Sequence, residues 1–320
     1  MRTEFPLISI IIPTYNRAAI IGDTLNSVKH QSYDNWECII VDDASGDDTS
    51  AVVKNYVDAD PRYRYLANKR TKGAPGARNT GVENSTGSYL IFLDSDDQLS
   101  KDCLLNRLNK FQLYPEPDFL VFSTVEYKET ITDTNLLINV STKENIIERF
   151  LNLDIPWITC GAVWKRESFL RLGGWDEKIL SWQDWELHIN ALLKNYQYLY
   201  FSTVDSYWKS NDATDSIGKH TFTSEHFRSH LRLTSNLKEK MKDNPRYLSL
   251  LNGLIYWLSE RALEQGFYEL SKEALINSHE DLHVAKKAIN LFGLGVFKKL
   301  PIKHPRVPGF GTYRKVFFYT

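Results

Sequence analysis

Apolar runs alternate with helical spacings along the first half of the chain. Five runs have the length and the β-branched and aromatic content of buried strands, at residues 7–12, 36–41, 63–67, 89–93 and 119–124. Between the first two runs, Ile21, Leu25 and Val28 recur at helical spacing. Strands that alternate with helices are typical of a mainly parallel sheet flanked by helices, in which ligands bind at the carboxyl ends of the strands. The sequence therefore predicts an α/β fold with a binding site in the loops that follow the strands.

The segment after the fifth run follows other patterns. Residues 126–140 become polar and β-branched, which we interpret as a loop or a hairpin. Residues 157–208 are rich in aromatic side chains, and an apparent helix covers residues 182–194. We interpret this aromatic segment as the second half of the binding site.

Beyond about residue 215 the alternation stops, and long helical patterns appear at residues 247–263 and 268–276. We therefore expect an α/β domain over residues 1–215 and a helical C-terminal region over residues 216–320. The last stretch is basic and aromatic, with no acidic residue after Asp281. Such a tail suits peripheral contact with an anionic membrane surface. A segment that packs its aromatics on the protein and leaves its charges in water fits the composition equally well.

The composition is that of an ordinary globular protein, with 320 residues, 42% hydrophobic residues and a net charge of −1. The near-zero charge argues against nucleic acid as a partner, because nucleic-acid binding calls for a markedly basic face. Cys38, Cys103 and Cys160 are odd in number and share no ligand spacing, so we expect buried thiols in a reducing compartment. The sequence contains no recognisable signal peptide and no apolar run long enough to span a bilayer. These features predict a cytoplasmic protein.

Asp94, Ser95 and Asp96 follow directly on the apolar run at residues 89–93. Two aspartates at positions i and i+2 behind a buried strand offer hard oxygen ligands for Mg²⁺ or Mn²⁺, and these ions commonly complete their shell with substrate phosphates. The sequence therefore predicts a metal site that binds a diphosphate. An acidic turn or a helix cap is an equally common use of such a tripeptide.

Five short motifs lie in order along the chain, each at a predicted strand end or in a loop. They are Pro13-Thr14-Tyr15-Asn16-Arg17, Val41-Asp42-Asp43-Ala44-Ser45, Gly76-Ala77-Arg78-Asn79-Thr80-Gly81, Phe92-Leu93-Asp94-Ser95-Asp96-Asp97 and Gln183-Asp184-Trp185. Together they resemble glycosyltransferase family 2 over about residues 5–210. The resemblance implies a GT-A fold, a nucleotide-diphosphate sugar as donor, Mn²⁺ or Mg²⁺ as cofactor, and transfer with inversion at the anomeric carbon.

The resemblance also implies a donor site built from the first four motifs. Its residues would be Pro13, Tyr15, Asn16, Asp42, Asp43, Arg78, Asp94, Ser95 and Asp96. The resemblance implies that Asp43 accepts a hydrogen bond from uracil, and it favours UDP as the nucleotide, with GDP and dTDP as alternatives. Asp42 could share this role, and helix capping is the alternative use of Asp43.

The diphosphate side of this site would combine the metal with positive charge. Asp96 would bind the metal directly, whereas Asp94 would contact either the ribose or the metal. Arg78 would bring a guanidinium to the diphosphate. The neighbouring basic side chains are expected to be solvated, namely Lys69, Arg70 and Lys72.

Asp184 is the candidate base. An attacking sugar hydroxyl loses its proton to a carboxylate, and an aspartate with an unperturbed pKa of about 3.9 is ionised at neutral pH. The family pattern has a Glu-Asp pair at these two positions. Gln183 stands where the pattern has the glutamate, so one carboxylate is missing, and Asp184 remains as the base. Capping of the helix that follows is the alternative role of Asp184. Many family members carry a further metal ligand, a histidine, close to where Asn211 stands, so we expect His220 or water to complete the metal shell.

Three tryptophans are candidates for the acceptor side, Trp157, Trp182 and Trp185. Flat apolar rings pack well against sugar C–H groups, although aromatics at this density also serve as core. These expectations describe an inverting, metal-dependent hexosyltransferase that acts on a saccharide or a lipid-linked saccharide, at the inner face of a bacterial membrane during surface polysaccharide biosynthesis. The alternatives are transfer to a polyprenyl phosphate and a GT-A-fold scaffold protein that has lost the reaction.

Overall fold

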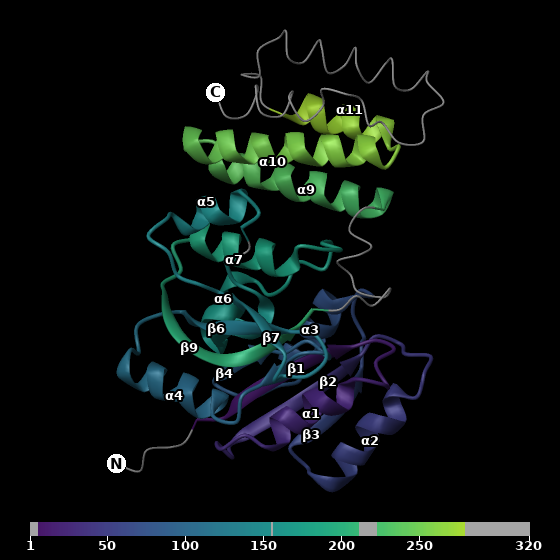
Figure 1. Ribbon diagram of the computed structural model, residues 1–320, viewed down its shortest axis with the longest axis vertical. Helices are drawn as coiled ribbons and strands as arrows, with labels where there is room; N and C mark the ends of the chain where they lie inside the picture. The colour runs from purple at the N-terminus through teal and green to yellow at the C-terminus, as the bar shows by residue number, and fades with distance from the viewer. Residues whose placement is uncertain (1–5, 155, 211–222, 279–320) are drawn as a thin grey trace. The chain divides into compact units, whose positions relative to one another are not determined.

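A computed structural model describes residues 6–154, 156–210 and 223–278 of the chain (Figure 1). The contacts within it divide the chain into two compact units. One unit comprises Met1–Ile146 and Ile155–Asp212, and the other comprises Ile147–Asp154 and Ala213–Thr320. The predicted basic and aromatic tail lies outside the described residues, as do Asn211 and His220.

The first unit is built on one sheet. Its strands are β1 (Ile8–Thr14), β2 (Trp36–Asp42), β3 (Tyr63–Ala67), β4 (Tyr89–Phe92), β5 (Gln98–Leu99), β6 (Phe119–Tyr127), β7 (Thr134–Ile138), β8 (Ala162–Lys165) and β9 (Tyr198–Lys209). They are ordered β3-β2-β1-β4-β8-β6-β9-β5, and β7 pairs with β6. The strands from β3 to β4 run parallel, whereas β8 is antiparallel to both of its neighbours.

The helices of this unit connect the strands. They are α1 (Ile21–Lys29), α2 (Thr49–Ala59), α3 (Ala74–Glu83), α4 (Cys103–Leu113), α6 (Arg166–Leu172) and α7 (Gln183–Leu193), and α5 (Ile146–Leu151) begins at its boundary. The predicted α/β fold is therefore confirmed. The segment at residues 126–140, which the sequence left between a loop and a hairpin, is the β6–β7 hairpin.

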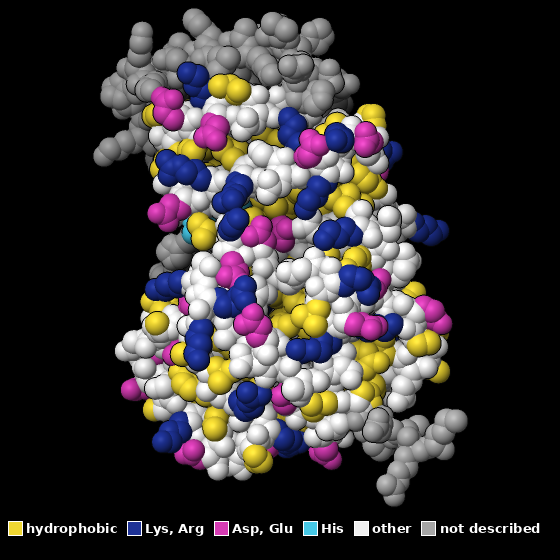
Figure 2. Space-filling view, turned by 180° about the vertical axis from the view of Figure 1, so that it is seen from behind, with side chains coloured by type: hydrophobic (Ala, Val, Ile, Leu, Met, Phe, Trp, Pro, Cys, Tyr) yellow, Lys and Arg dark blue, Asp and Glu magenta, His cyan; other side chains and the backbone are white. Residues whose placement is uncertain are grey.

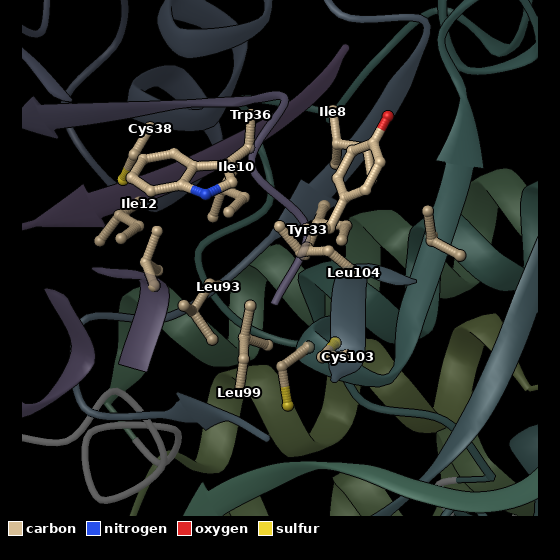
Figure 3. Close-up of a cluster of buried hydrophobic side chains, with 14 of the residues drawn as sticks. Ile8, Ile10, Ile12, Tyr33, Trp36, Cys38, Leu93, Leu99, Cys103 and Leu104 are labelled. Carbon is tan, nitrogen blue, oxygen red and sulfur yellow. The ribbon is translucent and has the colours of Figure 1, made fainter. Parts of the chain in front are cut away.

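Both faces of the parallel strands are buried, which explains their continuous apolar sequences. On one face, Ile10, Ile12, Cys38 and Ile40 join side chains of α1, α2 and α4 in one cluster (Figure 3). On the other face, Ile39 and Val41 pack against Ala77 of α3.

Helix α3 approaches β1 closely on this second face. A Cβ atom on Gly81 would lie 2.4 Å from the Ile11 side chain, so only glycine permits this spacing. Phe92 of β4 packs on the same face against the rings of Phe169 and Trp175, at centroid distances of 4.9 and 5.1 Å. This packing places α3 and the segment after α6 beside the carboxyl ends of β1 and β4.

The second unit is helical, as the sequence predicts for the C-terminal region. Its long helices are α9 (Ser224–Met241), α10 (Pro245–Glu264) and α11 (Tyr268–Asn277). Asn244 caps α10 by accepting a hydrogen bond from the Tyr247 backbone N–H at 3.1 Å. The Ser259 hydroxyl of α10 lies 2.9 Å from the Ser271 hydroxyl of α11 and joins the two helices inside their interface. Among the described residues, no helix combines the length and the hydropathy that crossing a membrane requires.

The three cysteines are free and buried, as predicted. Burial raises the pKa of each thiol well above its ordinary value, so all three are protonated at neutral pH. Figure 2 shows Lys and Arg side chains interspersed with Asp and Glu over the described surface of one face. This mixture agrees with the net charge of −1.

Candidate active site

The loops after β1 and β2 are tied to each other. Asn16 has a left-handed backbone with φ of 51°, which asparagine tolerates better than most residues. Its backbone N–H donates to Ser45 Oγ at 2.9 Å, and its Oδ1 accepts from the Gly46 backbone N–H at 2.8 Å. The Arg17 backbone N–H donates to Thr49 Oγ1 at 2.8 Å. The first two motifs of the sequence therefore form one rigid edge at the carboxyl ends of β1 and β2.

Two neighbouring acids of the second motif have different partners. Asp42 accepts hydrogen bonds from the Ser45 backbone N–H at 3.1 Å and from the Tyr65 hydroxyl at 2.6 Å, so it shapes its own loop. Asp43 accepts from Asn68 Nδ2 and from the Gly73 backbone N–H, both at 2.7 Å. Asp43 therefore holds the segment before α3 and does not cap α2. A carboxylate has acceptor capacity beyond two hydrogen bonds, so Asp43 can still accept one from a ligand.

Tyr15 and Pro13 occupy different environments in the first motif. Pro13 is buried at the end of β1, whereas the side chain of Tyr15 is 46% exposed. Lys72 Nζ lies 5.1 Å from the centre of the Tyr15 ring. An exposed ring beside Asp43's loop is a surface on which a flat base can stack.

Arg78 of α3 connects the third and fourth motifs. Its Nη2 donates to Asp94 Oδ1 at 2.6 Å, and its side chain is only 5% exposed, whereas that of Asp94 is 35% exposed. The guanidinium also lies over the Trp175 ring, with Cζ 4.5 Å from the ring centre. Arg78 therefore forms an ion pair with Asp94, and Asp94 is the more exposed of the two side chains.

Asp94, Ser95, Asp96 and Asp97 follow β4 and form a turn, which we call the acidic turn. Ser95 is buried in it, and the other three residues are aspartates. Burial and the nearby Asp94 carboxylate raise the pKa of Asp96, against the opposing charges of Arg17 and Lys209. Asp97 is completely buried, and burial raises its pKa well above the usual range. Negative charge is therefore crowded at this point of the sheet.

The end of β9 closes this turn from the other side. The Lys209 backbone N–H donates to Asp97 Oδ1 at 3.0 Å. The Tyr127 hydroxyl of β6 donates to the Asp96 backbone carbonyl at 2.9 Å. Sequence reasoning assigned no role to Lys209, Asp97 or Tyr127, because they come together only through the pairing of β6 with β9.

Helix α7 brings Asp184 to the same region. Trp182 precedes the helix with a left-handed backbone, φ of 63°, and Asp184 Oδ1 accepts from the Trp185 backbone N–H at 2.9 Å. Burial raises the pKa of Asp184, and the charges of Arg78 and Asp94 act on it in opposite directions. Gln183 Oε1 accepts from Arg78 Nη1 at 2.8 Å, which links α7 to α3. The candidate base therefore lies within electrostatic reach of the acidic turn.

The three predicted acceptor-side tryptophans occupy two kinds of position. Trp157 is buried and packs against Phe119, His188 and Tyr198, so its ring is part of the core. Trp185 is also buried, with its ring 5.7 Å from that of Trp182. Trp182 alone among the three is partly exposed. His188, to which the sequence gave no role, is buried among aromatic rings, and burial lowers its pKa to about 4.

A polar cluster that sequence reasoning missed supports this region. Asn79 Nδ2 donates to the Trp175 carbonyl at 2.9 Å and to Glu177 Oε1 at 2.8 Å. Glu177 also forms an ion pair with Arg70, which in turn pairs with Glu83. Arg70 was expected to be solvated, and its side chain is 39% exposed while two carboxylates bind its guanidinium. The signal in the sequence was Asn79, a polar side chain next to the predicted Arg78.

The donor set of the acidic turn fits a shared divalent cation. Asp94 and Asp96 supply two carboxylates, and burial together with the charge of Asp94 raises the pKa of Asp96, a charge that a cation would offset. Among the described residues, no group of three or more His, Cys, Asp or Glu side chains is arranged to hold a metal ion. Two protein ligands suit an ion whose remaining ligands are water and phosphate oxygens.

Comparison with known proteins finds similar sequences in bacterial glycosyltransferases. The chain is 44% identical over 103 residues to TuaG of Bacillus subtilis, a glycosyltransferase named for teichuronic acid biosynthesis, with 32% of this chain and 41% of TuaG covered. It is 36% identical over 106 residues to the GalNAc(5)-diNAcBac-PP-undecaprenol beta-1,3-glucosyltransferase of Campylobacter jejuni, with 33% of this chain and 34% of the relative covered. The matches thus span less than half the length of these relatives.

Two solved structures share the fold at 16% sequence identity. S. aureus TarS 1-349 in complex with UDP-GlcNAc has a TM-score of 0.65 and covers 85% of this chain and 82% of its own. The mannosyltransferase PcManGT from Pyrobaculum calidifontis, in complex with GDP-Man and Mn2+, has a TM-score of 0.57 and covers 93% and 83%. The family model described as glycosyl transferase family 2 matches residues 9–171. With half of the chain matched and the predicted motifs assembled at one edge of its sheet, this protein belongs to glycosyltransferase family 2.

Proposed function

We propose that the protein is an inverting, metal-dependent hexosyltransferase that uses a nucleotide-diphosphate sugar, favouring a UDP-sugar, and transfers the sugar to a hydroxyl of a saccharide or lipid-linked saccharide. The observation that carries this proposal is the grouping of Arg78, Asp94, Asp96 and Asp184 from three separate elements. Residues 1–215 would form the transferase domain and residues 216–320 a helical C-terminal region.

Asp43 and Tyr15 support the nucleotide part of the proposal. The carboxylate of Asp43 is held in place by Asn68 and Gly73, which prepares it to accept an N–H from a base. The N3–H of uracil is such a donor. Tyr15 is exposed beside this position and offers a stacking surface.

Asp94 and Asp96 are the residues that would hold Mn²⁺ or Mg²⁺. When bound, such a cation offsets the negative charge that develops on a departing nucleoside diphosphate. The chain's own contribution is to hold this turn, through Arg78 on the Asp94 carboxylate and through Tyr127 on the Asp96 backbone carbonyl. One solved structure with this fold is described with GDP-Man and Mn2+, which supports a divalent ion.

Asp184 is proposed as the base. Its raised pKa makes it a stronger proton acceptor than an exposed aspartate, while an aspartate near the start of a helix remains within reach of the stabilising N–H groups there. The attacking hydroxyl of the acceptor would give its proton to the Asp184 carboxylate as the new glycosidic bond forms.

The acceptor is proposed from the relatives. The Campylobacter jejuni relative is named for a saccharide linked to undecaprenol through a diphosphate, and TuaG is named for a cell-surface polymer. A lipid-linked saccharide used in surface polysaccharide biosynthesis is the acceptor class that these names support. The reaction would then take place in the cytoplasm at the inner membrane face, with peripheral contact through the basic and aromatic tail.

Thermal stability with a nucleotide panel tests the donor site, because a ligand that binds only the folded state raises the melting temperature by mass action. UDP, GDP, dTDP and CDP are each added with and without Mn²⁺ to the wild type and to Asp96→Ala. We expect a shift selective for UDP that requires Mn²⁺ and is lost in Asp96→Ala. If no nucleotide shifts the folded wild type, the scaffold alternative replaces the transferase.

A further inference from the structure

Gln183 stands between the two halves of the proposed site. Its Oε1 accepts a hydrogen bond from Arg78 Nη1 at 2.8 Å, and its Nε2 donates to the Leu180 carbonyl at 3.1 Å. The second bond fixes which way the amide faces, so Gln183 meets the guanidinium with its oxygen. Arg78 thus has one neutral acceptor and one charged acceptor, Asp94.

The surroundings of this contact are rich in negative charge. The charge of the Asp94 carboxylate acts on both Asp96 and Asp184. Arg78 and Arg17 are among the cations that oppose this charge. A carboxylate in contact with Arg78 would cancel part of the positive charge that the region has.

Arg78 also retains an unused hydrogen-bond donor. Its Nε is buried and has no acceptor among the residues that the structure describes. A buried donor without an acceptor is destabilising, and a phosphate oxygen is an acceptor that matches a guanidinium in charge and geometry. The site thus offers both charge and a donor to an anion.

We propose that Gln183 is a positioning residue that holds Arg78 beside Asp94 without adding charge, and that its neutrality sets the affinity of the site for the diphosphate of the donor. This inference rests on the proposed function. It concerns a residue at which the chain departs from the Glu-Asp pattern of its family, and it gives that departure a physical consequence. A glutamate at the same place would keep the hydrogen bond to Arg78 and compete with the diphosphate for its charge.

Two substitutions separate position from charge. Gln183→Glu keeps the acceptor and adds a negative charge, whereas Gln183→Met keeps a similar volume and removes the acceptor. Gln197→Glu is the matched control, because it makes the same change of charge at an exposed position after α7. Binding of UDP with Mn²⁺ is measured by titration calorimetry, binding of uridine by saturation-transfer NMR, and kcat and KM for the donor by turnover.

We expect Gln183→Glu to weaken UDP binding about tenfold, because the new carboxylate and the diphosphate carry like charges a few ångströms apart. Uridine has no diphosphate, so its binding should be unchanged. Its melting temperature should stay close to that of the wild type, because an ion pair with Arg78 offsets the lost hydrogen bond to the Leu180 carbonyl. Gln183→Met should lower kcat about tenfold and alter UDP affinity less than Gln183→Glu does. Gln197→Glu should match the wild type.

The inference is overturned if Gln183→Glu binds UDP as tightly as the wild type, or if Gln183→Met weakens UDP as much as Gln183→Glu. Either result would leave Gln183 as a structural contact and would leave the proposed function standing. If the folded wild type itself binds no nucleoside diphosphate, the proposed function fails instead.

Discussion

Asn79 and Trp175 are joined through both polar groups of the asparagine side chain. Asn79 Nδ2 donates to the Trp175 carbonyl at 2.9 Å, and Asn79 Oδ1 accepts from the Trp175 backbone N–H at 3.0 Å. The residues are 96 positions apart in the chain. Because the Trp175 ring lies against the guanidinium of Arg78, this pair fixes a face of the proposed diphosphate site.

Replacing Asn79 should loosen that face. Asn79→Asp removes the donor to the Trp175 carbonyl and places a carboxylate beside Glu177, so we expect a loss of about 1–3 kcal/mol in the free energy of unfolding. We also expect kcat to fall about tenfold, since Arg78 loses the ring that supports it. Urea unfolding and turnover measure the two effects. Asn236→Asp, at an exposed position of α9, should change neither, and equal behaviour of the two variants would contradict the prediction.

Gly76 allows the segment before α3 to fold back on the helix. A Cβ atom at this position would lie 1.9 Å from the Thr71 carbonyl oxygen, a backbone atom that cannot turn aside. Gly76→Ala should therefore displace the segment that Asp43 holds and lower the melting temperature by several degrees, equivalent to about 2 kcal/mol or more. UDP binding should weaken in the same variant.

Gly46→Ala is the control for this substitution, because a Cβ there meets no atom within 4 Å. Differential scanning fluorimetry should place its melting temperature within about one degree of the wild type, as expected for a surface change worth less than about 0.5 kcal/mol. If the two alanine variants have the same melting temperature, the close approach at Gly76 is not a constraint on this fold.

Arg107 and Asp205 form an ion pair whose side chains are both completely buried. Arg107 also donates to the Cys160 carbonyl at 2.8 Å, and the Cys160 side chain is hydrogen-bonded to Asp97 of the acidic turn. Arg107→Met should destabilise the protein by about 3–5 kcal/mol, because it leaves the Asp205 carboxylate buried without its partner. The double variant Arg107→Met/Asp205→Leu should recover much of this loss. Urea unfolding of the two variants decides the matter, and a double variant less stable than the single one would refute it.

Replacing Asp184 with asparagine should raise the stability of the protein and lower its activity. Its raised pKa means that the folded state disfavours the ionised carboxylate, so its penalty on folding grows as the pH rises through the unfolded pKa and is complete above the folded one. Asp184→Asn should then melt at a higher temperature than the wild type at pH 7, with nucleotide binding retained. Turnover should fall by about 10²–10⁴-fold, because the proposed base is lost.

The pH profile provides a second measurement on Asp184. In the wild type, kcat should fall as the pH decreases through the raised pKa, since protonated Asp184 cannot accept the acceptor's proton. The residual activity of Asp184→Asn should lack this acid limb. An unchanged acid limb in the variant would assign the proton transfer to another group.

Much of the fold, and the meeting of the loops after β1, β2 and β4 at one edge of the sheet, could be predicted from the sequence, because strand periodicity is local and these loops contain their own polar residues. Helix α7 could also be predicted, at residues 182–194, because helical periodicity is local, and the structure has it at Gln183–Leu193. What the sequence did not reveal are contacts across the sheet. Arg78 meets Gln183 at a separation of 105 residues, a relationship that no local pattern encodes.

The burial of Trp157 is a second case of this kind. Its aromatic character was visible, but whether a ring faces sugar or core depends on neighbours from other elements. The structure surrounds it with Phe119, His188 and Tyr198, which come from β6, α7 and β9. Composition alone could not separate the two uses of such a ring.

Glu177 should make the stability of the first unit depend on pH. Its carboxylate loses some hydration through partial burial, but hydrogen bonds from Asn79, Arg70 and Thr71 outweigh that cost and lower its pKa to about 2. A carboxylate with a lowered folded pKa contributes stability that is present above the unfolded pKa of about 4.3 and is lost as the pH falls toward the folded value. We therefore expect Glu177→Gln to be less stable than the wild type at pH 7 by about 1.5–3 kcal/mol, the usual range for hydrogen bonds to a charged group.

The two proteins should become similar in stability between about pH 4 and pH 2, where the wild-type carboxylate takes up its proton. Melting temperatures from pH 7 to pH 2.5 measure this convergence. Glu83→Gln is a matched control, because Glu83 also pairs with Arg70 but is 58% exposed, against 16% for Glu177. An exposed pair contributes about 0–1 kcal/mol, so Glu83→Gln should follow the wild type at every pH. If Glu83→Gln shows the larger loss, Arg70 is held mainly by the exposed carboxylate, and Glu177 contributes through Asn79 and the Thr71 backbone N–H.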